Sequence, residues 1–270
     1  MTKYNYYLTI FCCLFLLSCD DDNTDETHQI NLEWKNVPAG EFTMGQYDAS
    51  NSLDYSYDIM VNELSNAEYV QFLNEAYSQG SVSTDMNNSV FGYYHGDEKW
   101  VEDNYEFLDL DDADCRIEWD GYEFMVEIGY DNYPVVEVTW MGAWAMADFY
   151  GYSLPTQTEW EKAARGNTGW DYPWGDEDPT CDLATYAGCN GGGGATDITQ
   201  TSGMSPYGLL NMAGNVWEWV DSFSEEFDYK REYCGGGWTN YQESIKSWKV
   251  ESDRPDESKY NTGFRLIRIE

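Results

Sequence analysis

The chain has 270 residues, of which 42% are hydrophobic and 17% aromatic, so it can bury a sizeable core and is not disordered throughout. Its 14 basic and 50 acidic residues give a formal net charge of −36. Such an acidic surface repels phosphate backbones and argues against nucleic-acid binding, and it disfavours anionic polysaccharides unless a cation bridges the two surfaces.

The N-terminus has the pattern of a secretory signal over residues 1–18. Lys3 precedes an apolar run at residues 6–17, which is too short to cross a bilayer as a mature helix. The run ends in Leu-Leu-Ser-Cys, which resembles a bacterial lipobox, so we expect lipidation of Cys19 and an anchor in the outer membrane of the cell envelope.

Residues 19–30 are interpreted as an acidic linker without apolar periodicity. Three aspartates directly follow Cys19 and resemble the surface-export signal of Bacteroidetes-type lipoproteins. The alternative is a solvated tether. We expect the domain that follows, over residues 31–270, to be exposed on the cell surface.

Four cysteines lie beyond the linker, and an even number in an oxidising compartment suggests disulfides. Cys181 and Cys189 lie close together in a Gly-rich region and form the favoured pair, which leaves Cys115 with Cys234. Three pairings are possible, and the sequence does not choose among them.

The first half of the domain contains one clear helix. Residues 34–45 indicate a strand, a turn and a strand, and residues 122–128 are a further strand candidate in an acidic, loop-rich stretch. Ser65 and Glu68 form a capping box before an apolar stripe of helical period, so we expect a helix that reaches Gln79 and ends before a glycine.

The second half alternates short strands with two helices. Residues 134–140 alternate as a strand and lead into a helix at 143–150, and Thr156 with Glu159 opens another helix that ends near Arg165. Further short strands are expected near 215–220, Trp238 and 264–269. The fold class is therefore α+β, with much irregular chain.

Eight sequence blocks appear in the order seen in formylglycine-generating enzymes, also called sulfatase-modifying factors. They include Leu-Pro-Thr-Gln-Thr-Glu-Trp, Asn-Met-Ala-Gly-Asn-Val-Trp-Glu-Trp and Gly-Phe-Arg, and they occupy residues 40–45, 63–69, 134–140, 154–166, 172–175, 205–219, 235–238 and 263–265. The chain resembles this family over roughly residues 34–270. The resemblance implies an irregular, loop-rich domain related to C-type lectins.

The resemblance also implies a calcium ion. The ligands carried over are the Asn211 side chain, the carbonyls of Gly214 and Val216, and the Glu218 carboxylate, all of them the hard oxygen donors that calcium prefers. The alternative is that these polar groups only satisfy the loop backbone. A second family site lies near Thr185, where relatives usually carry asparagine.

The family enzyme oxidises a sulfatase cysteine with copper(I) held by two thiolates beside a serine. Counted from the Gly-Gly pair at 235–236, the serine position is Gly237 and the two cysteine positions are Asn240 and Ile245. No cysteine follows Cys234, which is a single thiol and does not make a two-sulfur site. Copper is therefore not expected, and no catalytic residue is assigned.

Other site chemistries have weak support. The two histidines, His28 in the linker and His95 in an acidic loop, lie outside any motif for a Ser-His-Asp triad or a two-histidine iron site. Trp238 and Trp248 flank the degenerate segment and are the better candidates for lining a cleft. Core packing is favoured for the tryptophans in the family blocks, Trp140, Trp160, Trp174, Trp217 and Trp219.

Two functions remain open. The first is a non-catalytic, calcium-stabilised module that binds a protein or a glycan at the cell surface and is held to the membrane by its lipid. The second is a sulfatase-modifying oxidase that acts through an unrecognised site. The sequence favours the first, because all three copper-pocket positions have changed.

Overall fold

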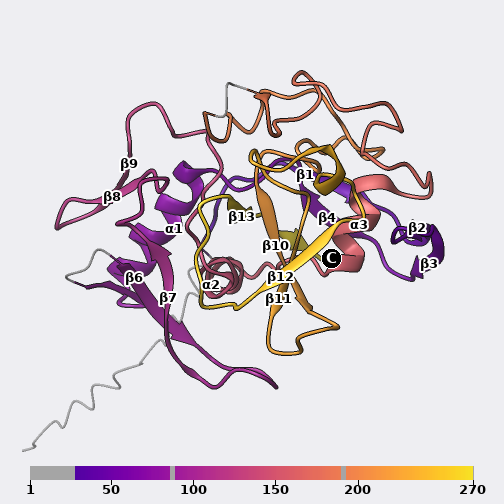
Figure 1. The fold of residues 1–270 in the computed structure, drawn as a ribbon. Coiled ribbons are helices and arrows are strands. Elements are labelled where there is room, and N and C mark those ends of the chain that lie inside the picture. Colours follow the sequence, from indigo (N-terminus) through magenta and orange to yellow (C-terminus); the bar gives the residue numbers. More distant parts are fainter. Residues whose placement is uncertain (1–27, 86–88, 190–192, 270) are drawn as a thin grey trace, which may run out of the picture.

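The computed structural model describes residues 28–85, 89–189 and 193–269 (Figure 1). The helices in this part are α1 (Asn66–Ser78), α2 (Trp140–Tyr150), α3 (Gln157–Arg165) and the 3-10 helix η2 (Gln242–Ser244). The strands are β1 (Trp34–Val37), β2 (Gly40–Met44), β3 (Ala49–Leu53), β4 (Tyr57–Met60), β5 (Val82–Thr84), β6 (Ser89–Tyr94), β7 (Asp103–Asp109), β8 (Ile117–Trp119), β9 (Phe124–Val126), β10 (Trp217–Phe223), β11 (Arg231–Cys234), β12 (Val250–Asp253), β13 (Thr262–Phe264) and β14 (Ile267–Arg268). The α+β class is thereby confirmed.

The capping boxes begin the helices as predicted. In α1 the Glu68 backbone N–H donates to the Ser65 hydroxyl, while the Glu68 carboxylate accepts from the Ser65 backbone N–H. Thr156 and Glu159 make the same reciprocal pair at α3. Helix α2 begins three residues earlier than expected, because Thr139 is its N-cap and accepts from the Gly142 N–H.

The strands form several small sheets of two to four strands. The four-stranded sheet has the order β12-β11-β10-β13, in which β10 and β13 run parallel, and it lies at the centre of Figure 1. The other sheets are β1-β4-β14, β5-β6-β7 and the hairpins β2-β3 and β8-β9. The two strands expected within residues 34–45 are present, but they pair with β4 and β3 respectively, not with each other.

Two strand predictions are wrong. Residues 134–140 make only isolated bridges, Pro134 with Ser65 and Val138 with Leu108. Glu137 between them has a left-handed backbone (φ 59°), which breaks an extended run despite the alternating sequence. Trp238 lies in a turn and not in a strand.

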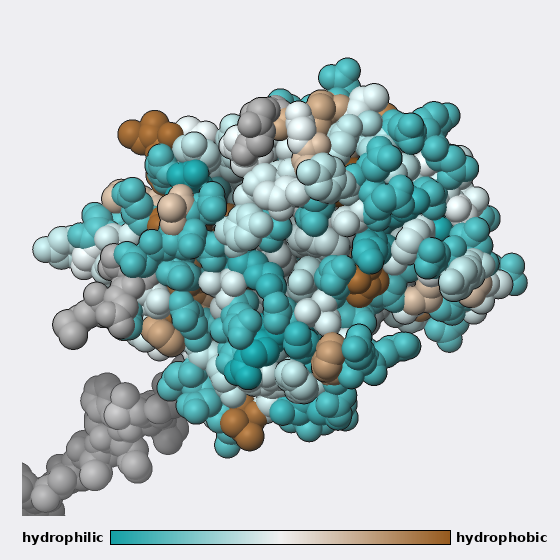
Figure 2. All heavy atoms as spheres, viewed as in Figure 1, coloured by the Kyte–Doolittle hydropathy of each residue, from teal (hydrophilic) through white to brown (hydrophobic). Residues whose placement is uncertain are grey.

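The core has two main parts. The larger part lies where α1 and α2 meet the central sheet, with Tyr69, Phe72 and Trp219 among its fully buried rings. The second lies under α3 and contains Trp160 and Cys234. Figure 2 shows one face of the molecule, where hydrophilic residues dominate and hydrophobic ones form small, separate patches, as the net charge predicts.

Only one of the two expected disulfides is present. Cys181 and Cys189 are bonded, with Cα atoms 5.5 Å apart, which confirms the favoured pair. Cys115 and Cys234 are free thiols, so the second pairing is wrong. The physical reason is distance through the fold, because Cys115 packs against the larger core cluster and Cys234 lies inside the second one.

The lipobox and Cys19 lie outside the described residues. In the part of the chain that the structure describes, no helix is both long and apolar enough to cross a membrane.

Candidate functional site

The segment after β11 folds back on itself at two glycines. Gly235 and Gly236 both have left-handed backbones, with φ of 94° and 76°. A Cβ on Gly236 would lie 2.7 Å from the Ser244 carbonyl oxygen and 2.6 Å from the Ile245 side chain. Only glycine allows this approach. The turn therefore brings the degenerate copper positions together at one end of the central sheet.

All three degenerate positions are built into the fold. The Asn240 side-chain oxygen accepts from the Trp217 indole N–H (2.9 Å) and from the Gly237 backbone N–H (3.0 Å). Ile245 is fully buried and packs in a small apolar cluster with Tyr172. A Cβ at Gly237 would lie 3.2 Å from the backbone oxygen of Asn261, so even serine would be tight.

Cys234 does not supply the missing thiolate. It is buried in the cluster under α3, and burial raises the pKa of its thiol well above the ordinary value, with nearby carboxylates adding to the shift. Within the described residues, no group of three or more His, Cys, Asp and Glu side chains is placed to hold a metal ion. His28 and His95 are not brought together in a common site, since His28 stacks on Phe149 and His95 lies at 5.2 Å from Tyr93.

The two candidate cleft tryptophans lie in different pockets. Trp238 packs edge-on against Tyr260 (5.7 Å) at a polar pocket of about 670 Å³, on whose wall the Arg116 guanidinium lies 4.4 Å from the Tyr130 ring centre. Trp248 lines a separate pocket, and its indole N–H donates to Asp171 (3.1 Å). Trp140, Trp160, Trp217 and Trp219 are buried, whereas Trp174 is half-buried.

Glu218, the predicted carboxylate ligand of calcium, has protein partners in this structure. Its carboxylate is fully buried and accepts from Arg265 Nε (2.6 Å) and Nη2 (2.7 Å), and Trp160 Nε1 donates to it at 2.7 Å. These three donors occupy both oxygens of the carboxylate for which the family resemblance predicted a cation. Glu218 is therefore the anion of a buried ion pair.

Glu63 is a second buried carboxylate beside the loop that carries Asn211. It is fully buried, and its Oε2 atom accepts from the side-chain amides of Asn211 (2.7 Å) and Asn215 (3.2 Å). Its Oε1 atom has no hydrogen-bond partner, and neither has the buried Oδ1 atom of neighbouring Asn62. Burial, followed by the charge of Glu218, raises the pKa of Glu63 to about 8.

The loop that carries Asn211 is tightly constrained. Asn211 and Asn215 have left-handed backbones (φ 56° and 62°), and a Cβ on Gly214 would lie 2.4 Å from the Thr185 carbonyl oxygen. The sequence did contain a signal for Glu63. This acid lies in the family block at 63–69, but the capping box of α1 is made by Ser65 and Glu68, so Glu63 has no helix-capping role. An orphaned buried carboxylate oxygen beside an asparagine suits a hard cation.

Comparison with known proteins gives consistent matches. A model of the sulfatase-modifying factor enzyme 1-like domain matches residues 23–269. The chain is 34% identical over 174 residues to a formylglycine-generating enzyme of Thermomonospora curvata, which covers 50% of this chain and 55% of that protein. It is 31% identical over 149 residues to the inactive C-alpha-formylglycine-generating enzyme 2 of Bos taurus, which covers 50% of each chain.

The solved structures match over almost the whole domain. The crystal structure of CarF superposes with a TM-score of 0.64 at 18% identity, covering 89% of this chain and 99% of that one, which shows a shared fold. The chain spans only about half the length of the curated relatives named above.

Proposed function

The chain belongs to the sulfatase-modifying factor enzyme 1-like domain family, and from that premise we propose that it is a non-catalytic, calcium-stabilised binding module, lipid-anchored and exposed on the cell surface. The observation that carries the proposal is the loss of both thiolate positions. Copper(I) needs soft sulfur ligands, and Asn240 and Ile245 offer an amide and a hydrocarbon. Both side chains instead support the fold, through a hydrogen-bonded turn and a buried cluster.

The family includes a relative that is itself named inactive, the Bos taurus protein, with 31% identity. The relative from Thermomonospora curvata is named as an enzyme, at 34% identity. The alternative function, an oxidase that converts a sulfatase cysteine to formylglycine, has the support of this second likeness alone. The site chemistry favours the first function.

The pocket beside the degenerate segment is the candidate ligand site of the module. The exposed Tyr260 provides a ring on which a sugar or an aromatic side chain can stack, and the buried Trp238 supports it edge-on. Arg116 and Gln200 add polar groups to the lining of the same pocket. A protein or glycan ligand at the cell surface fits this mixture of groups.

Calcium would be held by Glu63, the carbonyls of Gly214 and Val216, and the Asn211 side-chain oxygen. This oxygen accepts from the Thr201 hydroxyl, a hydrogen bond that it would exchange for the ion. The ion supplies charge and six to eight coordination positions for oxygen, and so ties the loop at 211–216 to the start of α1. The unpartnered Oε1 atom of Glu63 supports this assignment, whereas the ion pair with Arg265 removes Glu218 from it.

The decisive experiment is an aldehyde assay on a peptide that carries the sulfatase cysteine motif, incubated with the full chain, copper and a thiol reductant. We expect no conversion above a protein-free control. The Thermomonospora curvata enzyme is the positive control. Mass spectrometry that detects loss of sulfur with gain of an aldehyde would overturn the proposal and establish the oxidase.

A triple variant tests whether only the site has been lost. Gly237→Ser, Asn240→Cys and Ile245→Cys together should restore copper binding but give poor turnover, because positional errors of about 1 Å can cost about 100-fold in rate. Turnover by the variant at the rate of the positive control would show an intact substrate cleft and contradict a module that has specialised in binding.

The membrane anchor is tested separately. In cells, Cys19→Ala should release the protein from the membrane fraction, while the wild type stays with it. Ser18→Ala is the matched control, because alanine before the cysteine preserves a small residue. Equal retention of Cys19→Ala and wild type would rule out the lipid anchor but would leave the catalytic question to the peptide assay.

A further inference from the structure

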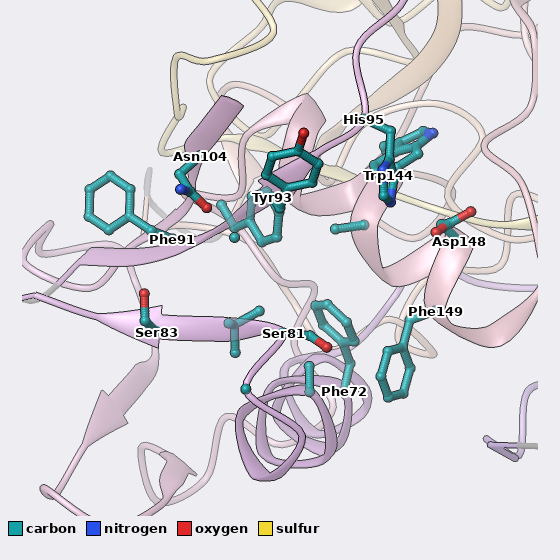
Figure 3. A pocket seen from close by; sticks show the side chains of 16 residues that line it. Phe72, Ser81, Ser83, Phe91, Tyr93, His95, Asn104, Trp144, Asp148 and Phe149 are labelled. Atoms are coloured by element: carbon teal, nitrogen blue, oxygen red, sulfur yellow. The ribbon is translucent and has the colours of Figure 1, made fainter. Parts of the chain in front are cut away.

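An aromatic pocket of about 370 Å³ lies between α1, α2 and strands β5 and β6 (Figure 3), and none of residues 235–245 lines it. Its volume is at the lower end of the range for small-molecule sites. Phe72 and Ala76 come from α1, Val82 from β5, and Phe149 from α2. These apolar side chains form the centre of the pocket.

On one wall of the pocket, the Phe107 ring packs directly on the backbone of Gly92 in β6. A Cβ on Gly92 would lie 2.2 Å from the Phe107 ring, so glycine in β6 is what allows this ring to lie against the strand. On the other side, His28 stacks on Phe149 with ring centres 4.4 Å apart. Two rings that line the pocket, Phe107 and Phe149, are therefore fixed by contacts with neighbouring residues.

Three further rings border the opening. Tyr93 of β6 and His95, just after the strand, are two residues apart, and their ring centres are separated by 5.2 Å. The ring centre of His95 lies 6.0 Å from that of Trp144 of α2 (Figure 3). Trp144 is half-buried, packs edge-on against Tyr94 (4.7 Å), and its indole N–H donates to no partner within the described residues.

The polar side chains at the rim include one carboxylate, that of Asp148, together with the amide of Asn104 and the imidazole of His95. Asp148 lies one turn after Trp144 on the same face of α2, and Asn104 lies on the opposite side beside Phe91 (Figure 3). Neither side chain has a hydrogen-bond or ion-pair partner among the described residues. The sixteen residues that line the pocket include no lysine and no arginine.

We propose that this pocket binds a small organic cation, an ammonium group carried on an apolar body. The apolar body would fill the space between Phe72, Val82 and Phe149, and the ammonium would lie at the rim near Trp144 and Asp148. Aromatic faces attract a cation through their quadrupole, and the carboxylate adds a direct charge interaction. The net charge of −36 raises the local concentration of cations and excludes anions of the same shape.

The test is calorimetric titration of the full chain with four probes at pH 8. Phenethylammonium should bind with a dissociation constant below about 1 mM. Phenethyl alcohol should bind about 5- to 30-fold more weakly, because it lacks the charge, and phenylacetate should not bind. N-acetyl-lysine amide separates the two sources of an ammonium, a free amine and a lysine side chain.

Variants locate the site. Asp148→Asn should weaken phenethylammonium about threefold and leave phenethyl alcohol unchanged, and Trp144→Ala should weaken both. Asp178→Asn is the matched control, since it removes one exposed acid from a residue that does not line the pocket. Because Trp144→Ala removes a packed ring, Asp148→Asn keeps the test valid if that variant fails to fold.

Three results would overturn the proposal. They are equal affinity for the amine and the alcohol, a dissociation constant for the amine above about 1 mM, and an equal loss of affinity in Asp148→Asn and Asp178→Asn. Equal loss in the two variants would mean that the affinity for the ammonium depends only on the net charge of the protein and not on Asp148.

Discussion

Arg265 and Glu218 form a two-point ion pair in the interior of the domain, with Nε 2.6 Å from Oε2 and Nη2 2.7 Å from Oε1, and both side chains are fully buried. The remaining guanidinium donors reach the carbonyl oxygens of Met60, Val61 and Leu210. The pair therefore connects the end of β4, Leu210 and β10 at a single point.

Breaking this pair should strongly destabilise the fold. Glu218→Gln leaves the Arg265 charge buried without its counter-ion, a change that typically costs about 3–5 kcal/mol. Urea unfolding followed by tryptophan fluorescence measures the loss. Glu251→Gln on β12, which is exposed, is the control and should stay within about 0.5 kcal/mol of wild type. A Glu218→Gln variant as stable as the control would contradict the central role of the pair.

Calcium should raise the stability of the wild type through Glu63. At about 100 times its dissociation constant, the ion adds roughly 2.7 kcal/mol, which corresponds to a rise in Tm of about 5–10 °C for a domain of this size. Glu63→Gln should lose the rise but remain folded without calcium, because the neutral amide replaces a carboxyl whose pKa is already raised to about 8.

The measurement is the Tm of each protein in chelator and in calcium. Glu251→Gln is the control, because it also removes one carboxylate. An equal rise in Glu63→Gln and in wild type would move the ion to other ligands. No rise in wild-type protein that has been stripped of metal would remove the calcium proposal altogether.

Two of the cysteines should behave as slow thiols. Burial raises the pKa of Cys115 to about 12 and the pKa of Cys234 well above its ordinary value. Little thiolate is therefore present at pH 8, and alkylation of the folded protein should be slow. Peptide mapping after iodoacetamide treatment should find both alkylated once the chain is denatured without reductant. Cys181 and Cys189 should become alkylated only after reduction. A Cys115–Cys234 peptide pair would contradict the structure.

Glu137 should make stability fall as the pH rises. Burial, and then the charges of Asp112 and Asp109, raise the pKa of this carboxyl to about 7, above its value of about 4.5 in the unfolded chain. The unfolded chain therefore releases its proton first, and the penalty grows between about pH 4.5 and pH 7, to at most about 3 kcal/mol.

Glu137→Gln removes that penalty, so the variant should gain more stability over wild type at pH 8 than at pH 5. Urea unfolding gives the free energy of unfolding of the variant and of wild type at each pH. Subtracting wild type from variant at each pH, and then comparing the two pH values, cancels the contributions of other titrating groups. Glu251→Gln should show no such dependence. A gain that is the same at both pH values would show that Glu137 is not held with a raised pKa.

The local signals of the sequence determined the parts that depend on neighbouring residues. Ser65 with Glu68 and Thr156 with Glu159 placed two helices, because a capping box is satisfied within four residues of chain. The family blocks determined the fold, and the sequence also identified the loss of thiols at Asn240 and Ile245, since residue type alone excludes a thiolate.

Only the tertiary structure decided which distant groups meet. The alternating run at 134–140 predicted a strand, but the left-handed Glu137 and its contacts with Asp109 and Lys259 make a bent connection. The sequence predicted Glu218 as a cation ligand, and the fold brings Arg265 to its carboxylate across 47 residues. Glu63 lies 148 residues from Asn211 in the chain, and no local pattern reports such a contact, because its free energy comes from burial that forms only when the whole domain closes.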